Sequence, residues 1–267
     1  MRSSVITGCG SGIGLAVINR ISEEGYFAVG VERDERTAAL LSDSLGERGA
    51  VVVGDVRDRN VLNRAAKIAT DSAPLGCWIN NVGVVLRGSL LTADPEDVEA
   101  VLQVNLMSYF WGSKIAVGTF VAQGSGGSIV NISSIHGRAS FPGYAAYDMV
   151  KGGIDALTRN TAVEYGPVGI RANAVAPGAI RTELLADVIS RSSDPQREEQ
   201  DMVALHPLGR LGEPPEIAAV VYFLASDQSS FISGQSIAVD GAATARCYRY
   251  EPDPDLLATF AAARGLS

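Results

Sequence analysis

Three side chains near the middle of the chain have the types and spacing that proton transfer at a hydroxyl group requires. Tyr147 and Lys151 are four residues apart on an expected helix, so they share one face of that helix. Ser134 lies thirteen residues before Tyr147, at the end of an expected strand. The intervening loop can return the chain so that both hydroxyls converge on one substrate oxygen. On spacing alone, a packed tyrosine beside a solvated lysine is the commoner arrangement.

The chemistry that suits this trio is removal of a proton from a secondary alcohol while hydride leaves the carbinol carbon. A free tyrosine has a pKa of about 10, too high for an efficient base near neutral pH. We expect the ammonium group of Lys151 to favour the phenolate and lower the pKa of Tyr147. Ser134 can hold the alkoxide-like oxygen by hydrogen bonding. A nicotinamide would carry the hydride, so the protein would only need to position the substrate and polarise its reacting oxygen.

These residues need a scaffold, and the chain alternates short β-rich apolar runs with longer segments of helical period. We expect strands at residues 3–7, 27–31, 50–53, 77–80, 128–132, 171–176 and 236–239. We expect helices at residues 13–24, 58–71, 95–121, 147–165 and 215–224. Strands separated by single helices imply right-handed crossovers. The sequence therefore predicts an α/β fold: a single doubly wound Rossmann-type domain with about seven parallel strands and helices on both faces.

A glycine-rich segment follows the first expected strand and opens the first expected helix. It reads Thr7-Gly8-Cys9-Gly10-Ser11-Gly12-Ile13-Gly14. Glycines let a backbone turn tightly and approach a pyrophosphate, which rests at the positive end of the helix dipole. The expected cofactor contacts here are Gly8, Ser11, Gly12, Ile13 and Gly14. A glycine-rich turn without a ligand is the alternative, but its place between strand and helix favours the cofactor.

The ends of the next three strands carry further candidates for binding the cofactor. The carboxylate of Glu32 can accept hydrogen bonds from ribose hydroxyls and repels a 2′-phosphate, which favours NAD. Arg33 follows it and can pair with a 2′-phosphate, so NADP stays open, as does a reading of both residues as solvated turn charges. The third and fourth strand ends contribute Asp55, Val56, Asn81 and Gly83.

Composition excludes several other function classes. The formal net charge of −8 argues against nucleic acid and against anionic membranes as partners. Cys9, Cys77 and Cys247 are odd in number and lack metal-ligand spacing, so we expect reduced thiols, no disulfide scaffold and no metal site. No apolar run approaches the ~18 residues of a membrane span. We therefore expect a cytoplasmic protein that acts on a small molecule.

In order and spacing, these motifs resemble the short-chain dehydrogenase/reductase superfamily over nearly the whole chain, to about residue 242. The nucleotide fingerprint Thr-Gly-x3-Gly-x-Gly matches residues 7–14, and Tyr-x3-Lys matches Tyr147 and Lys151. The Asn-Asn-Ala-Gly motif of that family is present as Asn-Asn-Val-Gly at residues 80–83. The resemblance implies a catalytic set of Asn105, Ser134, Tyr147 and Lys151. It also implies cofactor contacts from Tyr147, Lys151, Pro177, Gly178, Ile180 and Thr182.

The resemblance implies a nicotinamide-dependent oxidoreductase that moves hydride between a cofactor, preferably NAD, and a secondary alcohol or ketone. Two alternatives stay open. A regulatory protein that binds NAD(P) without chemistry should lack at least one of the four catalytic residues, and all four are present. A reductase of C=C or C=N bonds usually spaces its tyrosine and lysine differently.

The substrate end of the site depends on less regular parts of the chain. We expect a catalytic domain at residues 1–244, including a substrate loop at 180–211 that closes over the substrate. His136 and Leu184 are the candidates for the substrate pocket, although a loop histidine satisfied by backbone or water is about as common. The tail at 245–267 would cap the active site or a subunit interface, or be frayed. The resemblance implies a homo-oligomer, a tetramer or a dimer.

Overall fold

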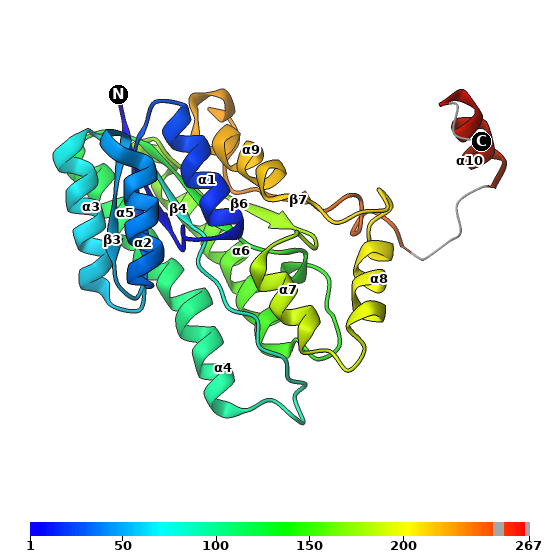
Figure 1. Ribbon diagram of the computed structural model, residues 1–267. Coiled ribbons are helices and arrows are strands. Elements are labelled where there is room, and N and C mark those ends of the chain that lie inside the picture. The colour runs from blue at the N-terminus through cyan, green and yellow to red at the C-terminus, as the bar shows by residue number, and fades with distance from the viewer. Residues whose placement is uncertain (248–253, 265–267) are drawn as a thin grey trace.

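The computed structural model describes residues 1–247 and 254–264, and this part of the chain contains one seven-stranded parallel sheet (Figure 1). Its order is β3-β2-β1-β4-β5-β6-β7, and all six neighbouring pairs are parallel. The strands are β1 (Ser3–Thr7), β2 (Phe27–Glu32), β3 (Gly49–Val53), β4 (Leu75–Asn80), β5 (Gly127–Ile132), β6 (Ile170–Pro177) and β7 (Ser236–Val239). The predicted Rossmann-type fold class is confirmed.

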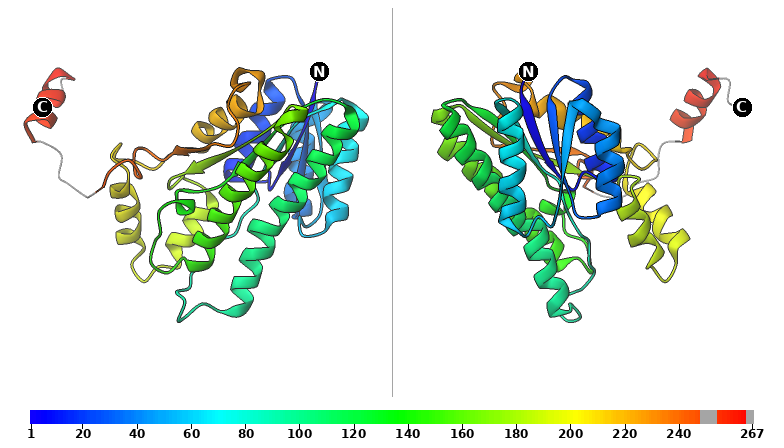
Figure 2. Two further views of the ribbon diagram at one scale, coloured as in Figure 1. Left: turned by 180° about the vertical axis from the view of Figure 1, so that it is seen from behind. Right: turned by 60° about the vertical axis from the view of Figure 1, so that its left-hand side comes forward.

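Helices cover both faces of this sheet, as Figures 1 and 2 show. Helices α1 (Gly12–Glu23), α2 (Glu35–Leu45) and α9 (Pro214–Ala225) pack on one face. Helices α3 (Arg59–Ser72), α5 (Ser108–Gln123) and α6 (Ala145–Tyr165) pack on the other. The remaining helices are α4 (Pro95–Val101), α7 (Glu183–Ser190), α8 (Pro195–Leu205) and α10 (Pro254–Ala263).

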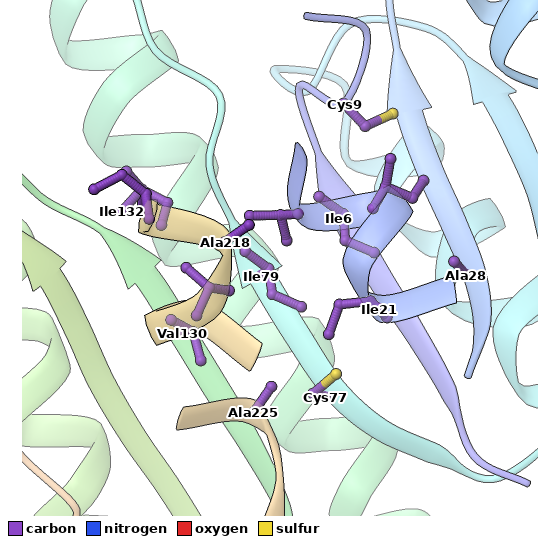
Figure 3. Close-up of a cluster of buried hydrophobic side chains, with 14 of the residues drawn as sticks. Ile6, Cys9, Ile21, Ala28, Cys77, Ile79, Val130, Ile132, Ala218 and Ala225 are labelled. Carbon is purple, nitrogen blue, oxygen red and sulfur yellow. The ribbon is translucent and has the colours of Figure 1, made fainter. Parts of the chain in front are cut away.

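Alternate side chains of each central strand enter two different cores. In the first, Ile6 and Val130 pack with helices α1 and α9 (Figure 3). In the second, their strand neighbours Val5 and Ile129 pack with helices α3 and α5. Successive side chains of a strand point to opposite faces, and both faces are covered by helices. The central strands are therefore buried on both faces, and their adjacent apolar residues, such as Val5 with Ile6 and Ile129 with Val130, made them recognisable in the sequence.

The structure differs from the expected helices in two places. The helix expected at 95–121 is interrupted by a π-helical segment, Leu102–Met107, which separates α4 from α5. The substrate loop expected at 180–211 contains helices α7 and α8. Helix α8 buries no residue in the described chain, so it lacks the apolar stripe by which a helix is recognised in a sequence.

Helix α2 was not predicted at all, although its sequence carries one start signal. Only three of its eleven residues are buried. Asp34 caps its first turn, because the carboxylate accepts a hydrogen bond from the backbone N–H of Thr37 at 2.8 Å. This cap marks the start of α2 in the sequence, whereas the apolar periodicity of the segment did not indicate a helix.

The C-terminal helix α10 is drawn apart from the sheet in every view of Figures 1 and 2. Tyr248, Tyr250 and Pro252 of the tail lie outside the described residues. Among the described helices, none combines the length and the apolar character that a membrane crossing requires.

Candidate functional site

A cavity of about 800 Å³ opens at the carboxyl ends of the strands. From β1, strands β2 and β3 follow on one side of the sheet, and strands β4 to β7 follow on the other. Open α/β sheets bind ligands at such a point, where the order of the strands changes direction. The predicted site residues that line the cavity are Gly8, Ser11, Gly12, Ile13, Gly14, Glu32, Arg33, Asp55, Val56, Asn81, Gly83, Ser134, His136, Tyr147, Lys151, Pro177, Gly178, Ile180, Thr182 and Leu184. Asn105 is not part of its wall.

The glycine turn at one end of the cavity is packed so closely that its shape needs glycine. Gly8 has a φ of +65°, which side chains rarely adopt, and a Cβ on Gly14 would lie 1.9 Å from the Gly8 carbonyl oxygen. The side-chain amide of Asn81 donates hydrogen bonds to the carbonyl oxygens of Thr7 (3.0 Å) and Gly8 (2.8 Å). The backbone at the start of α1 is thereby held against the cavity, which fits a pyrophosphate.

Glu32 lies beside this turn, and three backbone groups orient its carboxylate. Oε2 accepts a hydrogen bond from the N–H of Gly10 (3.0 Å), and Oε1 accepts from those of Arg33 (2.9 Å) and Asp34 (3.0 Å). A carboxylate held in this way presents a fixed negative charge to the cavity. The position fits recognition of ribose hydroxyls.

Asp55, one of the expected cofactor contacts, is paired with a nearby arginine. Its carboxylate forms an ion pair with Arg57 at 2.6 Å and accepts the backbone N–H of Arg57 at 2.8 Å. The hydrogen bonds from Arg57 hold the pKa of Asp55 below its ordinary value. Asp55 still lines the cavity, but its carboxylate is already paired with the Arg57 guanidinium.

Ser134 and Tyr147 come together at the other end of the cavity. Ser134 follows β5, and its Oγ accepts a hydrogen bond from the backbone N–H of His136 at 3.2 Å. The hydroxyl proton of Ser134 is therefore left for another acceptor, and the phenol of Tyr147 is within its reach. Helix α6, which begins at Ala145, carries Tyr147 in its first turn.

The expected lowering of the Tyr147 pKa is wrong for this structure. Burial raises the pKa of Tyr147 well above its ordinary value and outweighs the hydrogen bond from Ser134, which acts in the opposite direction. Spacing along a helix revealed a neighbouring lysine, but it could not show how completely the phenol is removed from water.

Lys151 is itself buried, with 3% of the residue exposed. Its Nζ donates a hydrogen bond to the carbonyl oxygen of Ile132 (2.8 Å) and lies 5.4 Å from the ring centre of Tyr147. Burial lowers the pKa of Lys151 to about 7, against the opposing effect of Asp155 one helical turn later. Lys151 therefore carries only part of its charge at neutral pH. This partial charge is a second reason why Lys151 stabilises the Tyr147 phenolate less than expected.

Asn105 lies in the π-helical segment and is completely buried. Its Oδ1 accepts a hydrogen bond from the N–H of Val84 and its Nδ2 donates to the Val84 carbonyl oxygen, both at 2.8 Å. The side chain thus clamps the segment after β4 behind the cavity wall. Both polar atoms of the Asn105 side chain are thus bonded to Val84, and among the described residues no hydrogen bond joins this side chain to Ser134, Tyr147 or Lys151.

His136 forms a pair with an acidic residue that the sequence did not single out. Its Nδ1 lies 2.5 Å from Oδ1 of Asp148, and Oδ2 of Asp148 accepts the N–H of Phe141 at 3.2 Å. The imidazole packs edge-on against the ring of Tyr147, with ring centres 5.0 Å apart. Asp148 follows Tyr147 directly, but only the folded loop shows that it contacts His136.

Helices α7 and α8 contact each other and contribute residues to the wall of the cavity, at what we call its substrate end. Leu184 of α7 and Glu198 of α8 are part of its wall. Glu198 forms an ion pair with Arg87, from the segment after β4, at 2.6 Å. Helix α8 is thereby tied to the segment after β4.

His206, at the end of α8, is a buried residue whose role the sequence did not reveal. Its Nε2 accepts a hydrogen bond from the N–H of Ala179 at 3.0 Å, and its Nδ1 lies 2.7 Å from the carbonyl oxygen of Met202. A Cβ on Gly178 would lie 2.4 Å from the same Nε2. His206 therefore supports the turn at residues 177–179 that lines the cavity.

Comparison with known proteins gives consistent matches along the chain. A family model described as enoyl-(acyl carrier protein) reductase matches residues 8–244. A cyclohexanol dehydrogenase of Acinetobacter sp. (strain SE19) is 34% identical over 250 residues, which cover 91% of this chain and 95% of the relative. A galactitol 2-dehydrogenase (L-tagatose-forming) of Cereibacter sphaeroides is 36% identical over 247 residues, 90% of this chain and 94% of the relative.

The fold also matches solved structures. The crystal structure of a single-residue variant of actinorhodin polyketide ketoreductase with NADPH superposes with a TM-score of 0.85. It is 25% identical in sequence, and the match covers 91% of this chain and 97% of that one.

Proposed function

The chain belongs to the short-chain dehydrogenase/reductase superfamily, whose members are oxidoreductases that use NAD or NADP, and we propose that it interconverts a secondary alcohol and the corresponding ketone with NAD. One observation carries the proposal. The hydroxyls of Ser134 and Tyr147 meet on the wall of a cavity whose other end is the glycine turn. Such a cavity can hold an alcohol and a dinucleotide side by side.

In the proposed mechanism, Tyr147 is the general base for alcohol oxidation and the general acid for ketone reduction. The phenolate of Tyr147 takes the hydroxyl proton while the C–H bond of the carbinol breaks. Ser134 donates its proton in a hydrogen bond to the reacting oxygen, as its acceptance of the His136 N–H permits. The Nζ of Lys151 lies 5.4 Å from the ring centre of Tyr147, and the fraction of Lys151 that is protonated favours the phenolate. The bound nicotinamide supplies the hydride acceptor.

The preference for NAD is proposed from Glu32. A 2′-phosphate on the adenosine ribose would lie beside a carboxylate that three backbone N–H groups hold in place. Repulsion between like charges disfavours NADP there, and Arg33, whose side chain also lines the cavity, opposes that preference. The relatives do not decide this point, because the ketoreductase of similar fold was crystallised with NADPH.

Reduction of an activated C=C bond is a second candidate, since the matching family model is described as an enoyl-(acyl carrier protein) reductase. The named relatives act on hydroxyl-bearing carbons, as a cyclohexanol dehydrogenase and a galactitol 2-dehydrogenase. Oxidation of NADH or NADPH by an enoyl thioester, measured beside oxidation by a cyclic ketone, discriminates between the two. We expect turnover of the ketone alone.

A homo-oligomer is proposed from the outer faces of α5 and α6. Four large apolar side chains on these two helices are exposed: Phe110 (44%), Val121 (55%), Met149 (54%) and Val163 (80%). Apolar surface of this extent on neighbouring helices is typical of subunit contacts. Sedimentation analysis that finds only the monomer at micromolar concentration would contradict it.

The test of the catalytic proposal is Tyr147→Phe. Loss of the proton-transferring group should lower kcat/KM for alcohol oxidation by about 10³-fold. Binding of NADH, measured by its fluorescence, should persist. Tyr165→Phe at the far end of the same helix is the matched control and should remain active. Near-normal turnover of Tyr147→Phe would overturn the assignment of Tyr147.

The pH dependence of the rate provides an independent check of the same residue. Because burial raises the pKa of Tyr147, its phenolate fraction should increase with pH throughout the neutral range. The rate of alcohol oxidation should therefore rise between about pH 6 and about pH 9. Lys151, with a pKa of about 7, loses its proton over the same range and should keep the slope below tenfold per pH unit. Ketone reduction, which uses the protonated phenol, should show no such rise.

A further inference from the structure

The His136–Asp148 pair lies at the substrate end of the cavity, and the proposed proton transfer does not use it. The imidazole is held between Phe141, with ring centres 4.3 Å apart, and the edge of Tyr144, at 5.2 Å. Asp148 fixes the ring from α6 through Nδ1. The ring can therefore rotate little, and its remaining nitrogen, Nε2, has a defined direction.

The partner of Nδ1 determines what Nε2 can do. An ionised carboxylate only accepts hydrogen bonds, so Nδ1 of His136 carries a proton. Burial lowers the pKa of His136 below its ordinary value, although Asp148 acts in the opposite direction. The neutral ring that prevails at pH 7 leaves Nε2 with a lone pair. Within residues 1–247 and 254–264, no hydrogen-bond donor reaches Nε2, so it is available to accept from a ligand.

The charges around the cavity narrow the class of ligand. Glu198 and Asp201 of α8 contribute carboxylates to its wall. Arg87, the cation nearest to Glu198, is already paired with that residue. A substrate carboxylate would be repelled here, whereas a neutral hydroxyl would not. The donor that suits Nε2 is therefore an O–H group.

Most of the remaining wall is apolar. Val104, Leu185, Val188, Met202 and Leu205 also line the cavity. A polyol with a hydroxyl on every carbon would leave several hydroxyls without partners against these side chains. A substrate with only a few neighbouring polar groups on an apolar frame would leave no hydroxyl against these apolar side chains.

We propose that His136 is a specificity residue that accepts a hydrogen bond from a second hydroxyl on the carbon next to the reacting one. The substrates would be 1,2-diols on an apolar frame and, in the other direction, the corresponding α-hydroxy ketones. The reacting oxygen engages Ser134 and Tyr147, and the neighbouring oxygen engages Nε2, whose ring packs against that of Tyr147. This inference rests on the proposed function.

Matched pairs of alcohols measure the contribution of the second hydroxyl. The pairs are cyclohexane-1,2-diol with cyclohexanol, butane-2,3-diol with butan-2-ol, and 1-phenylethane-1,2-diol with 1-phenylethanol. For the wild-type enzyme with NAD, kcat/KM should favour the diol of at least one pair by about 10-fold or more, as one hydrogen bond at a buried acceptor predicts. The quantity compared is the ratio of the two rates, which a general loss of activity does not change.

Two substitutions separate hydrogen bonding from packing. His136→Phe keeps an aromatic ring between Phe141 and Tyr144 but removes the acceptor, so the diol-to-alcohol ratio should fall toward one. His136→Gln retains a side-chain acceptor and should restore part of the ratio, which also guards against misfolding of the phenylalanine variant. Tyr165→Phe is the control and should keep the wild-type ratio.

Each outcome has a defined meaning. Oxidation of the single alcohols without preference for any diol would overturn the inference and leave the proposed function standing. A diol preference that survives in His136→Phe, or faster oxidation of mandelate than of 1-phenylethane-1,2-diol, would also overturn the inference. Turnover of neither kind of alcohol with NAD or NADP would contradict the proposed function as well.

Discussion

The two ends of the cavity are built in different ways. At the glycine turn, side chains at neighbouring strand ends bond to the backbone of the turn, as when the Glu32 carboxylate accepts the N–H of Gly10 and the Asn81 amide donates to the Gly8 carbonyl oxygen. At the substrate end, side chains from separate elements meet, as in the pairs His136–Asp148 and Arg87–Glu198. The first end is rigid because the sheet imposes it, and the second can vary without disturbing the sheet.

This difference predicts how each end responds to substitution. Where backbone is packed against backbone, an added methyl group has no room and the turn itself must move. Where partly exposed side chains form the contacts, losing one contact changes affinity or selectivity while the fold persists. The predictions below test this contrast, starting from the largest effect.

Gly14→Ala should disrupt the glycine turn. The new Cβ would lie 1.9 Å from the Gly8 carbonyl oxygen and 2.5 Å from Nδ2 of Asn81. Relieving this overlap should cost about 1–3 kcal/mol of unfolding free energy. Affinity for NADH should fall by about 10- to 100-fold, as followed by fluorescence titration and thermal denaturation. Gly118→Ala in α5, where no heavy atom lies within 4 Å of the new Cβ, should be neutral or stabilising. Unchanged NADH binding by Gly14→Ala would refute the assignment of the turn.

Glu32→Gln should change cofactor choice and leave the turn in place. The amide oxygen can still accept a hydrogen bond, but the charge that repels a 2′-phosphate is removed. The ratio of kcat/KM with NAD to that with NADP should fall by about 10-fold. Glu35→Gln removes an equal charge from the exposed first turn of α2 and should leave the ratio unchanged. An unaltered ratio in Glu32→Gln would mean that Arg33 or another residue sets the preference.

Glu198→Gln should have the smallest effect. It breaks the ion pair with Arg87, whose side chain is 39% exposed and partly screened by solvent. The free energy of unfolding should change by less than about 1 kcal/mol, and KM for the alcohol should rise by about 2- to 3-fold. Added salt should raise KM in the wild type more than in the variant. A loss of stability as large as that of Gly14→Ala would show that the two ends of the cavity do not differ as described.

The parts of the fold that the sequence predicted well are those with a strong local pattern. Strands β1 and β7 have their predicted bounds, four others differ by one or two residues at one end, and β6 is longer by one residue at each end. Helix α8 was missed because it buries no residue in the described chain, and α2 because it buries only three. Their existence depends on end caps such as Asp34 and Asp194 more than on burial.

The site shows the same division. The glycine turn, the strand ends and the Tyr147–Lys151 spacing were visible because neighbours in the sequence form them. Two other contacts were not visible in the sequence, because each joins separate segments of the chain. They are the contact of Asp148 with His136 and the hydrogen bond by which His206 supports the turn at residues 177–179. Nor did the sequence show that Asn105 would direct its side chain to Val84.

By itself, the sequence determined the seven strands, the family and the residues on the carboxyl edge of the sheet, because periodicity and glycine spacing are local properties. Only the tertiary structure decided the charge states at the site. Burial raises the pKa of Tyr147 and lowers that of Lys151 to about 7, and burial depends on every element packed around a group. It also placed His136 beside Tyr147 with no donor from the described residues at Nε2, and no spacing in the sequence encodes the direction of that nitrogen.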